Sequence, residues 1–494
     1  MTTEESPRVR VLRDLPEASE RAYVLYWMTA NRRLGWNFAL DRAVEWAHAL
    51  GKPLVILEAL AAGYRWASDR HHAFVLHGME EHRRHLAESP VAYHPYVEPA
   101  PGEGQGLLVA LAEHACVVVA DDAPVFFLPR ILESAAQRVS TRLEAVDSCG
   151  LLPMSRVDRP FSSAYHFRRF LHRTLAPYLT DLPDPAPLST AELEGGSVPD
   201  TVRSRWPEAP RELLAGSAQT LARLPIDHEV TPSPIRGGTS AARARLDQFL
   251  ARDLDRYGEE RNHPDSDASS RLSPWLHFGH MSVHEVFHRV AAREGWSPAR
   301  LATDATGKRE GWWGMGASAE AFLDELVTWR ELGFGFCRVV SDYDQYETLP
   351  EWARATLEDH ASDPRPWTYS LEAFARAETH DELWNAAQRQ LLGEGIMHNY
   401  VRMLWGKKIL EWSASPREAL RIMVELNNRY ALDGRDPNSY NGIMWVLGRF
   451  DRGWPERAVY GKVRSMSSER TRRKVSLDRY LERWGGQAAL DLNG

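Results

Sequence analysis

Residues 22–60, AYVLYWMTANRRLGWNFALDRAVEWAHALGKPLVILEAL, decide the fold of the first part of the chain. The continuous apolar run at 22–28 is typical of a buried strand, and 53–60 is a second such run. Between them, residues 37–50 carry apolar side chains at helical spacing, and Gly51 and Pro53 end that helix. A strand, a helix and a strand in this order predict a parallel sheet with right-handed crossovers.

The same alternation continues as far as residue 146. Further candidate strands lie at 91–98, 115–120 and 138–146, and helix signals surround 71–88. We therefore predict a doubly wound, Rossmann-like α/β domain at 1–150. No GxGxxG follows the first strand, which disfavours an ordinary NAD-binding domain. Seven prolines between Pro177 and Pro210 are typical of a connector and not of a packed element, so residues 151–235 are predicted to form a linker.

From about residue 236 the strand signals nearly vanish and a helical period takes over. Helices are predicted where apolar residues recur every 3.6 positions: 241–257, 283–293, 319–336, 372–377, 380–392, 396–412 and 416–430. The expected architecture is an α/β domain followed by an all-α domain at 236–494.

Composition limits the class of protein. A chain of 494 residues exceeds one ordinary domain. The three scattered cysteines, Cys116, Cys149 and Cys337, indicate neither a disulfide framework nor a metal site. No apolar run approaches 18 residues and the start lacks a secretory signal, so we expect a soluble cytoplasmic protein of bacterial or archaeal type, with a monomer as the simplest state. The net charge of −8 argues against a general nucleic-acid coat but permits a local basic face.

The run Ser269-Ser270-Arg271-Leu272-Ser273-Pro274 is the first candidate site. Hydroxyls and backbone amides in a turn that opens a helix form an anion site, because the donors converge at the positive end of the helix dipole. Plain capping by Ser273, with Pro274 at the first helical position, explains the same residues.

Tryptophan is the second signal, since 13 of the 18 tryptophans lie at or after Trp275. Trp405 and Trp412 are seven residues apart, which places them on one helix face roughly 10.5 Å apart along the axis. Trp384 lies on the preceding predicted helix. Rings at this spacing could relay an electron by short hops, although a stripe of packing residues has the same spacing.

Two polar segments complete the candidates. In the turn after the helix ending at Tyr430, opposite charges and amides predict either a solvated loop or a prearranged polar pocket, with Arg402 as an ion partner for Asp433. Residues 451–474 hold eight basic and three acidic side chains. Such a segment is either a phosphate-binding face or a solvated run of charge.

Together these segments resemble the cryptochrome/photolyase family, and within it the class II cyclobutane pyrimidine dimer (CPD) photolyases. The resemblance is dense over roughly 236–480 and covers the first domain only in outline. The strings that carry it are RLSPWLHFG (271–279), THDELWNAAQ (379–388), MHNYVRMLWGKKILEW (397–412), LNNRYALDGRDPNSYNGIMW (426–445) and GWPERAVYGKVRSM (453–466).

The resemblance implies a U-shaped FAD in the helical domain. Tyr257 and the run Ser269, Ser270, Arg271, Leu272, Ser273 would hold its diphosphate. Arg402 and Asp433 would form an ion pair near the isoalloxazine ring, and Asn427 would face the flavin N5. Trp405, Trp384 and Trp412 would be the proximal, medial and distal members of the family's electron-transfer chain.

The resemblance also implies light-driven repair of pyrimidine dimers in DNA. Photoexcited reduced FAD would donate one electron to the dimer, the two ring bonds would break, and the electron would return. Glu325 would hydrogen-bond the dimer bases. The flipped-out dimer would lie against Trp329, Met403 and Trp445. Arg452 and Arg464 would hold phosphates and fill the gap in the duplex.

Some stretches depart from the family pattern. Residues 30–37, ANRRLGWN, keep only part of an Arg-Asp…Asp-Asn pattern, so the pocket for the deazaflavin antenna that the resemblance suggests is not assigned. Phe334-Gly335 and Asn399 also differ from the residues that are common at these positions in the family. The stretch 307–317, with Trp312 and Trp313, has no counterpart and is interpreted as a surface loop near the DNA face or a partner contact.

Three alternatives remain open. The first is a cryptochrome-like photoreceptor without repair activity, which the dimer-pocket residues and the short tail after Tyr480 disfavour. The second is repair of (6-4) photoproducts, with His398 as the acid. The third is an α/β adenylate-handling enzyme without flavin.

Overall fold

The computed structural model describes residues 6–486, so residues 1–5 of the start segment and 487–494 of the tail lie outside it. The described chain forms two compact units that interleave along the sequence. Unit 1 holds residues 6–158, 175–245 and 272–292, and unit 2 holds 159–174, 246–271 and 293–486. The domain boundaries predicted at residues 150 and 235 divide the chain into consecutive segments, whereas these two units interleave. The predicted boundaries stay a prediction.

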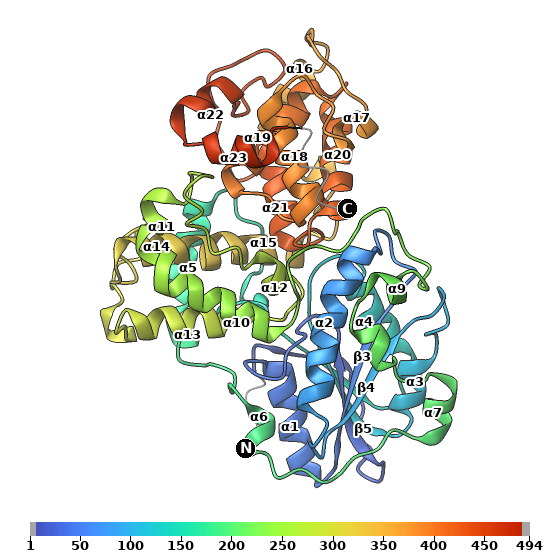
Figure 1. The fold of residues 1–494 in the computed structure, drawn as a ribbon. Coiled ribbons are helices and arrows are strands. Elements are labelled where there is room, and N and C mark those ends of the chain that lie inside the picture. The colour runs from blue at the N-terminus through green and yellow to red at the C-terminus, as the bar shows by residue number, and fades with distance from the viewer. Residues whose placement is uncertain (1–5, 487–494) are drawn as a thin grey trace. The chain divides into compact units, whose positions relative to one another are not determined.

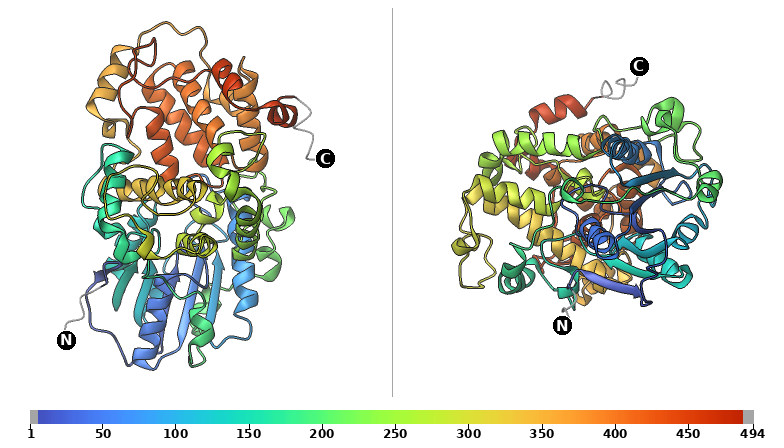
Figure 2. Two further views of the ribbon diagram at one scale, coloured as in Figure 1. Left: turned by 90° about the vertical axis from the view of Figure 1, so that its left-hand side faces the viewer. Right: turned by 90° about the horizontal axis from the view of Figure 1, so that it is seen from below.

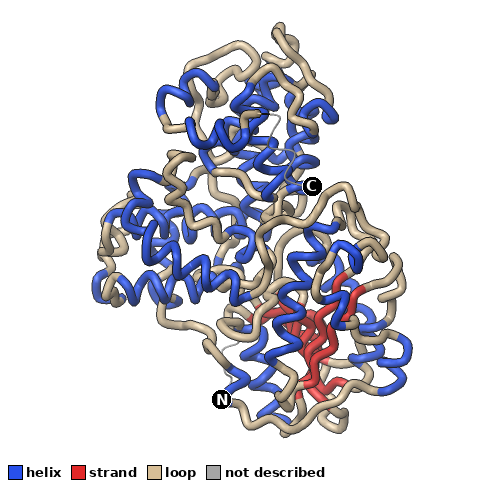
Figure 3. Tube along the Cα trace, viewed as in Figure 1, coloured by secondary structure: helices blue, strands red, loops and turns tan. Residues whose placement is uncertain are grey.

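Unit 1 is built on a six-stranded sheet in the order β1-β6-β5-β2-β3-β4. Figures 1 and 3 show these strands gathered within unit 1. All neighbours pair in parallel except β1 and β6, which pair antiparallel. The strands are β1 (Val9–Arg13), β2 (Tyr23–Met28), β3 (Leu54–Leu60), β4 (Ala92–Val97), β5 (Ala115–Asp121) and β6 (Arg142–Val146).

The five strands predicted from apolar runs are present, although β6 begins four residues later than predicted. These strands can be predicted from apolar runs because they are buried: every residue of β2 and of β5 is buried. β1 was not predicted. Its sequence VRVLR contains two arginines and forms a partly exposed edge strand, so it lacks the continuous apolar run of a buried strand.

Helices cover both faces of this sheet (Figure 1). On one face α1 packs against Val24 and Tyr26, and on the other α3 and α4 pack against Leu25. The α1 caps match the sequence signals: the Asn37 side chain accepts from the Ala39 N–H, and Gly51 adopts φ +59°. The helices along the sheet are α1 (Phe38–Leu50), α2 (Asp69–His85), α3 (Leu107–Ala112) and α4 (Leu128–Arg138).

The interpretation of 177–210 as an unpacked connector is wrong for part of its length. Val198, Val202 and Trp206 are buried in the core of unit 1, and the Trp206 indole donates to the Glu103 carbonyl at 2.9 Å. Prolines limit the helices here to short pieces without preventing burial. The elements of residues 151–235 are η1 (Met154–Arg156), α5 (Ala164–Thr174), η2 (Ala176–Tyr178), α6 (Pro187–Thr190), α7 (Asp200–Arg205), α8 (Arg211–Leu214) and α9 (Ala218–Leu221).

Between residues 236 and 486 the regular elements are helices, as predicted. The helix α19 contacts α18, α20 and α21, and the views in Figure 2 show these orange helices bundled together. The elements are α10 (Thr239–Gln248), η3 (Phe249–Asp253), α11 (Leu254–Glu260), α12 (Ser273–His277), α13 (Val283–Arg293), η4 (Pro298–Arg300), α14 (Ala317–Leu323), η5 (Asp324–Trp329), α15 (Arg330–Val339), η6 (Tyr346–Thr348), α16 (Glu351–Asp359), α17 (Leu371–Ala375), α18 (Glu382–Glu394), α19 (Asn399–Trp412), α20 (Pro416–Tyr430), α21 (Pro437–Val446), α22 (Ser468–Lys474) and α23 (Asp478–Trp484).

Two helices that the periodicity predicted as continuous contain a π-helical turn. These turns are η3, within the predicted helix 241–257, and η5, within 319–336. A π turn adds one residue per turn, which an apolar period of 3.6 cannot reveal, and such turns are frequent at functional sites. η5 carries Glu325 and Trp329.

Residues 30–37, which differ from the family pattern, form hydrogen bonds inside unit 1. The Arg33 guanidinium donates to the carbonyls of Trp36 and Gly279 at 3.0 Å each, and Asn37 donates to the Tyr26 hydroxyl at 2.8 Å. Arg32 donates to the Glu58 carboxylate at 2.8 Å. Their polar groups therefore stabilise the loop after β2.

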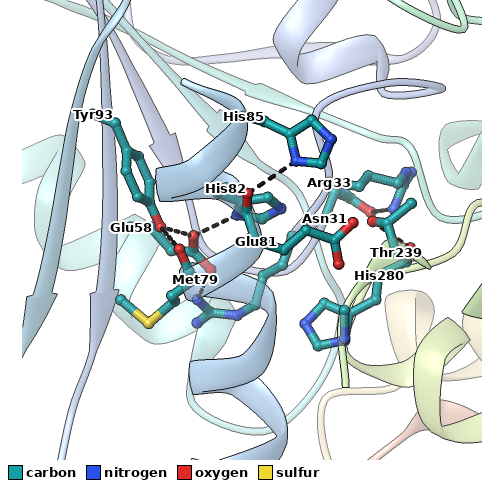
Figure 4. Close-up of polar contacts among 12 residues, drawn as sticks. Asn31, Arg33, Glu58, Met79, Glu81, His82, His85, Tyr93, Thr239 and His280 are labelled. Carbon is teal, nitrogen blue, oxygen red and sulfur yellow. Dashed lines mark hydrogen bonds and ion pairs between the residues drawn. The ribbon is translucent and has the colours of Figure 1, made fainter. Parts of the chain in front are cut away.

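Glu58 lies at the centre of a buried polar cluster in unit 1 (Figure 4). Its carboxylate is fully buried and accepts from Arg32 at 2.8 Å and from the Tyr93 hydroxyl at 2.6 Å, while His82 Nδ1 lies 2.8 Å away. Burial raises the pKa of Glu58, but the charges and hydrogen bonds of His82, Arg32 and Tyr93 outweigh burial and lower it to about 2.

Glu58→Gln is expected to lower the free energy of unfolding at pH 7 by about 3 kcal/mol. A carboxyl with a depressed pKa stabilises the fold above its ordinary pKa of 4.5, and this contribution is lost as pH falls through about 2. Urea titrations between pH 7 and pH 3 measure the effect. Glu45→Gln, on an exposed ion pair with Arg42, is the control and should cost under about 1 kcal/mol. Equal losses in both variants would contradict the role of the cluster.

Across residues 6–486, we find no helix with the length and apolar character needed to span a membrane.

Candidate functional site

Helix α19 positions four of the predicted site residues. Gly395 ends α18 in the left-handed region at φ +72°, which lets the chain turn and begin α19 at Asn399. Arg402, Met403, Trp405 and Trp412 then follow on this helix. Because residues three apart are neighbours on a helix surface, Arg402 lies one turn before Trp405.

The three predicted redox tryptophans form one contiguous chain. The rings of Trp405 and Trp384 are stacked with centroids 6.4 Å apart, and Trp384 meets Trp412 edge-on at 6.2 Å. All three side chains are buried. The Trp384 indole donates to the Trp405 carbonyl at 3.0 Å, and the Trp405 indole donates to Gln388 Oε1 at 2.9 Å. The tertiary structure thus brings the rings into contact, which the spacing alone left open.

Aromatic contacts continue outward from Trp412. Its ring meets the rings of His380 at 4.8 Å and Tyr369 at 5.9 Å. His380 stacks on Trp367 at 4.5 Å, and Trp367 is half exposed. The buried tryptophans are therefore connected to the protein surface through side chains that the sequence did not single out.

Arg402 and Asp433 form the predicted ion pair. The guanidinium donates to both carboxylate oxygens, with Nη1–Oδ2 at 3.2 Å and Nη2–Oδ1 at 2.9 Å. This bidentate geometry fixes the orientation of both side chains. Asn427, at the end of α20, is buried and its amide donates to Asn428 Oδ1 at 3.4 Å. The turn after α20 is therefore a prearranged polar structure, not a solvated loop.

The predicted diphosphate residues divide between the two units. Tyr257, Ser269, Ser270 and Arg271 belong to unit 2, whereas Leu272 and Ser273 belong to unit 1, where Ser273 opens α12. Tyr257 is buried against Phe249 and Phe322. Arg271 adopts φ +53°, a conformation that costs energy for a side chain of this size. Diphosphate binding by this run stays a prediction.

Arg261 is a site residue that the sequence did not reveal. Its guanidinium donates to Glu325 Oε1 at 2.6 Å and lies 5.4 Å from the centre of the Tyr257 ring. It therefore links two predicted site residues. Burial raises the pKa of Glu325, and the Arg261 charge opposes that rise. A lone arginine after a helical segment carries no sequence signal of such a role.

The residues predicted to line a dimer cavity are placed on separate helices of unit 2. Trp329 lies on η5, and its carbonyl accepts from the Asn441 amide of α21 at 3.4 Å. Met403 and Trp445 are partly buried at the edge of the large core of unit 2. Partial exposure of Met403 and Trp445 leaves part of each side chain available to a ligand.

Arg452 and Arg464 converge on one tryptophan. Their guanidinium carbons lie 5.2 Å and 4.9 Å from the centre of the Trp454 ring, and Arg464 also lies 5.7 Å from the Trp445 ring. The Trp454 indole donates to Asp451, with its nitrogen 3.2 Å from Oδ2. Part of the basic segment therefore alternates cations with aromatic rings, a combination that suits phosphates and unpaired bases.

The stretch 307–317 is not a simple surface loop. Trp312 and Trp313 are buried, and Trp312 stacks on His172 with centroids 4.4 Å apart and planes 2° apart. The Trp296 indole donates to the Trp313 carbonyl at 2.6 Å. The two adjacent tryptophans therefore anchor this stretch inside unit 2, which excludes them as a contact surface for a partner.

Several polar groups of unit 2 are of the kind that binds a flavin nucleotide. An oriented ion pair and a buried asparagine amide lie at the ends of α19 and α20, and a stacked indole chain begins one turn from Arg402. Asn441 Oδ1 is buried and has no hydrogen-bond partner among residues 6–486. An unpaired buried acceptor of this kind costs about 1–3 kcal/mol, which a bound polar group offsets. These residues fit FAD.

A parallel α/β unit and a helical unit with a buried tryptophan chain define the photolyase-type architecture. A search of solved structures supports this fold: a bacterial class III photolyase from Agrobacterium tumefaciens aligns over 94% of this chain and 86% of its own, with a TM-score of 0.65 and 21% identity. No family model matches the chain.

Curated relatives match over nearly the full length. The deoxyribodipyrimidine photo-lyase of Methanothermobacter thermautotrophicus is 34% identical over 97% of this chain and 98% of its own. Those of Potorous tridactylus and Arabidopsis thaliana are each 32% identical, covering 95% and 93% of this chain and 83% and 88% of their own. The chain therefore belongs to the deoxyribodipyrimidine photolyase family, a family of enzymes.

Proposed function

We propose that this protein is a class II photolyase that binds FAD in the helical half of its chain, residues 236–494, and splits cyclobutane pyrimidine dimers in DNA under light. When bound and reduced, FAD supplies an electron donor that blue or near-ultraviolet light excites. The observation that carries the proposal is the arrangement on α19, where the Arg402–Asp433 pair lies one turn from a buried chain of three tryptophan rings.

The residues of this chain have separate roles in the proposed reaction. Arg402, Asp433 and Asn427 orient the flavin ring, and Tyr257 with Ser269–Ser273 holds the diphosphate. Trp329, Met403 and Trp445 exclude water from the dimer. Glu325, held by Arg261 at 2.6 Å, hydrogen-bonds the bases and supports the charge that develops there. Burial raises the pKa of Glu325, and the charge and hydrogen bond of Arg261 oppose that rise.

His398 bears on the choice of lesion. Repair of (6-4) photoproducts would require this side chain as an acid. Burial, together with the charge of Arg271, lowers the pKa of His398 to about 4. At neutral pH the imidazole is then uncharged and a poor proton donor. His398 is therefore a weak candidate for the acid that repair of (6-4) photoproducts would need.

A deazaflavin antenna in the α/β unit is a further part of the proposal, and it rests on the family resemblance alone. Reconstitution with a deazaflavin, followed by near-ultraviolet absorption and energy transfer to FAD, tests it. Absence of binding would remove the antenna and leave the repair proposal unaffected, because the residues proposed for repair belong to the helical half of the chain.

The decisive test is repair of ultraviolet-irradiated oligonucleotide by purified protein with reduced FAD. We expect light-dependent restoration of dimer-containing thymine tracts, and none in the dark. An oligonucleotide with a single (6-4) photoproduct is the matched substrate control and should remain unrepaired. Bound flavin with no repair under light would favour the photoreceptor alternative, and a preparation without flavin absorbance would favour the adenylate-handling enzyme.

A further inference from the structure

Lys407 is a fully buried lysine in unit 2, two residues after Trp405 on α19. Its ammonium donates to the Val446 carbonyl at 2.6 Å and lies 4.8 Å from the centre of the Trp445 ring. It forms no ion pair with any carboxylate of residues 6–486. Neither the electron chain nor the flavin contacts described above require this side chain.

A buried ammonium without a carboxylate is costly, because desolvation disfavours the charged form. One carbonyl hydrogen bond and one cation–π contact offset only part of that cost. A lysine in this setting indicates a use for its charge. A methionine or leucine of similar length would otherwise pack there at lower cost.

Lys407 begins a row in which cations and rings alternate. Trp445 lies between Lys407 at 4.8 Å and Arg464 at 5.7 Å, and Trp454 lies between Arg464 at 4.9 Å and Arg452 at 5.2 Å. Lys407 is buried, whereas Arg464 is half-buried and Arg452 is exposed. The row therefore connects a buried charge to the proposed phosphate-binding arginines.

We propose that Lys407 is a positioning residue that holds the Trp445 ring for the flipped dimer, and that lesion DNA binds with uptake of a proton by this side chain. The inference rests on the proposed function, because it takes Trp445 as a wall of the dimer site. Lys407 acts through the orientation of Trp445 and does not itself contact the dimer.

The direction of the pH dependence follows from the charges around Lys407. Burial lowers its pKa to about 7, Asp451 opposes that shift and Arg464 adds to it. Two other titratable groups border this residue: the Tyr460 hydroxyl donates to the Lys407 carbonyl at 2.9 Å, and Glu411 lies 3.3 Å from that hydroxyl. DNA phosphates that neutralise Arg464 remove a repulsion and favour the charged lysine.

Binding therefore takes up a proton near pH 7, and affinity for lesion DNA falls as pH rises above it. One linked proton changes the dissociation constant by at most about tenfold per pH unit. We expect the dissociation constant for dimer-containing duplex to rise roughly threefold or more between pH 6.5 and pH 8.5. This rise is smaller than the limit set by one linked proton.

The experiment measures this constant by fluorescence anisotropy at fixed salt for the FAD-loaded wild type, Lys407→Met, Lys407→Arg and Lys462→Met. Lys407→Met should bind dimer DNA weakly at every pH, with a flat profile. Lys407→Arg should recover affinity and also lack the pH dependence, because arginine stays charged. Lys462→Met removes an exposed charge of the same basic segment and should keep the wild-type pH profile.

The inference would be overturned if DNA binding by Lys407→Met had the same pH profile as the wild type, or if binding by the wild type did not depend on pH. Neither result would contradict the proposed repair function. Wild-type protein without preference for dimer DNA would instead overturn the proposed function. Should Lys407→Met fold poorly, Lys407→Arg and the wild type decide the matter by their pH profiles alone.

Discussion

Trp405→Phe is expected to slow light-driven reduction of the oxidised flavin strongly while sparing dimer repair by chemically prereduced enzyme. Phenylalanine fills most of the space of the indole but is much harder to oxidise, so the chain from Trp384 to the flavin is interrupted. We expect photoreduction to slow by about two orders of magnitude or more, equivalent to roughly 2.7 kcal/mol in an activation barrier. Flavin absorbance under blue light, with an external thiol present, measures the rate.

The matched control is Trp484→Phe. Trp484 is buried in the same core as Trp405 and loses the same volume, but within residues 6–486 no ring contact joins it to the tryptophan chain. This variant should photoreduce at the wild-type rate. Trp384→Phe, in the middle of the chain, should reproduce the Trp405→Phe defect. Rapid photoreduction in Trp405→Phe would show that electrons reach the flavin by another route.

Arg168→Met is expected to lower the free energy of unfolding by about 3 kcal/mol, because it leaves the buried Asp324 carboxylate with only the more distant Arg309, at 3.9 Å. Arg168 lies on α5 and donates to both oxygens of Asp324, with Nε–Oδ1 at 2.7 Å and Nη2–Oδ2 at 3.0 Å. Each side chain is only 6% exposed. Arg168 also donates to the Gly307 carbonyl at 3.2 Å, so it fixes the start of the 307–317 stretch.

The consequence should extend to the site, because Asp324 directly precedes Glu325 in the π turn. Urea denaturation monitored by circular dichroism gives the stability, and dimer-DNA binding below the unfolding range gives the effect on Glu325. Arg169→Met, on the exposed side of α5, should change stability by no more than about 0.5 kcal/mol. The double variant with Asp324→Leu should regain much of the loss. Matching results for Arg168→Met and Arg169→Met would refute the positioning role.

Local periodicity determined most of the secondary structure. Strands β2 and β5 are buried along their full length, so their apolar runs are visible in the sequence, and Asn37 with Gly51 marks both ends of α1. Periodicity missed β1, which is half polar at the sheet edge, and the π turns, which change the period by one residue. It also treated 177–210 as unpacked, because prolines shorten helices whether or not the segment is buried.

The site was predictable where its residues share one helix. Arg402, Trp405 and Trp412 have helical spacing, so their order along α19 follows from the sequence. Arg261 and Arg168 were not predictable, because each pairs with a carboxylate more than sixty residues away. Long-range pairs depend on how helices pack, and packing leaves no periodic signal at a single charged position.

The sequence by itself determined the order of a parallel α/β part and a helical part, the placement of Trp405 and Trp412 on one helix, and the basic segment at 451–474. The tertiary structure alone decided that the indoles stack, that α5 buries Arg168 against Asp324, and that Lys407 is enclosed beside Trp445. The physical reason is that hydrogen bonding and apolar burial along one element follow its local period, whereas the environment of a charge depends on every element packed around it.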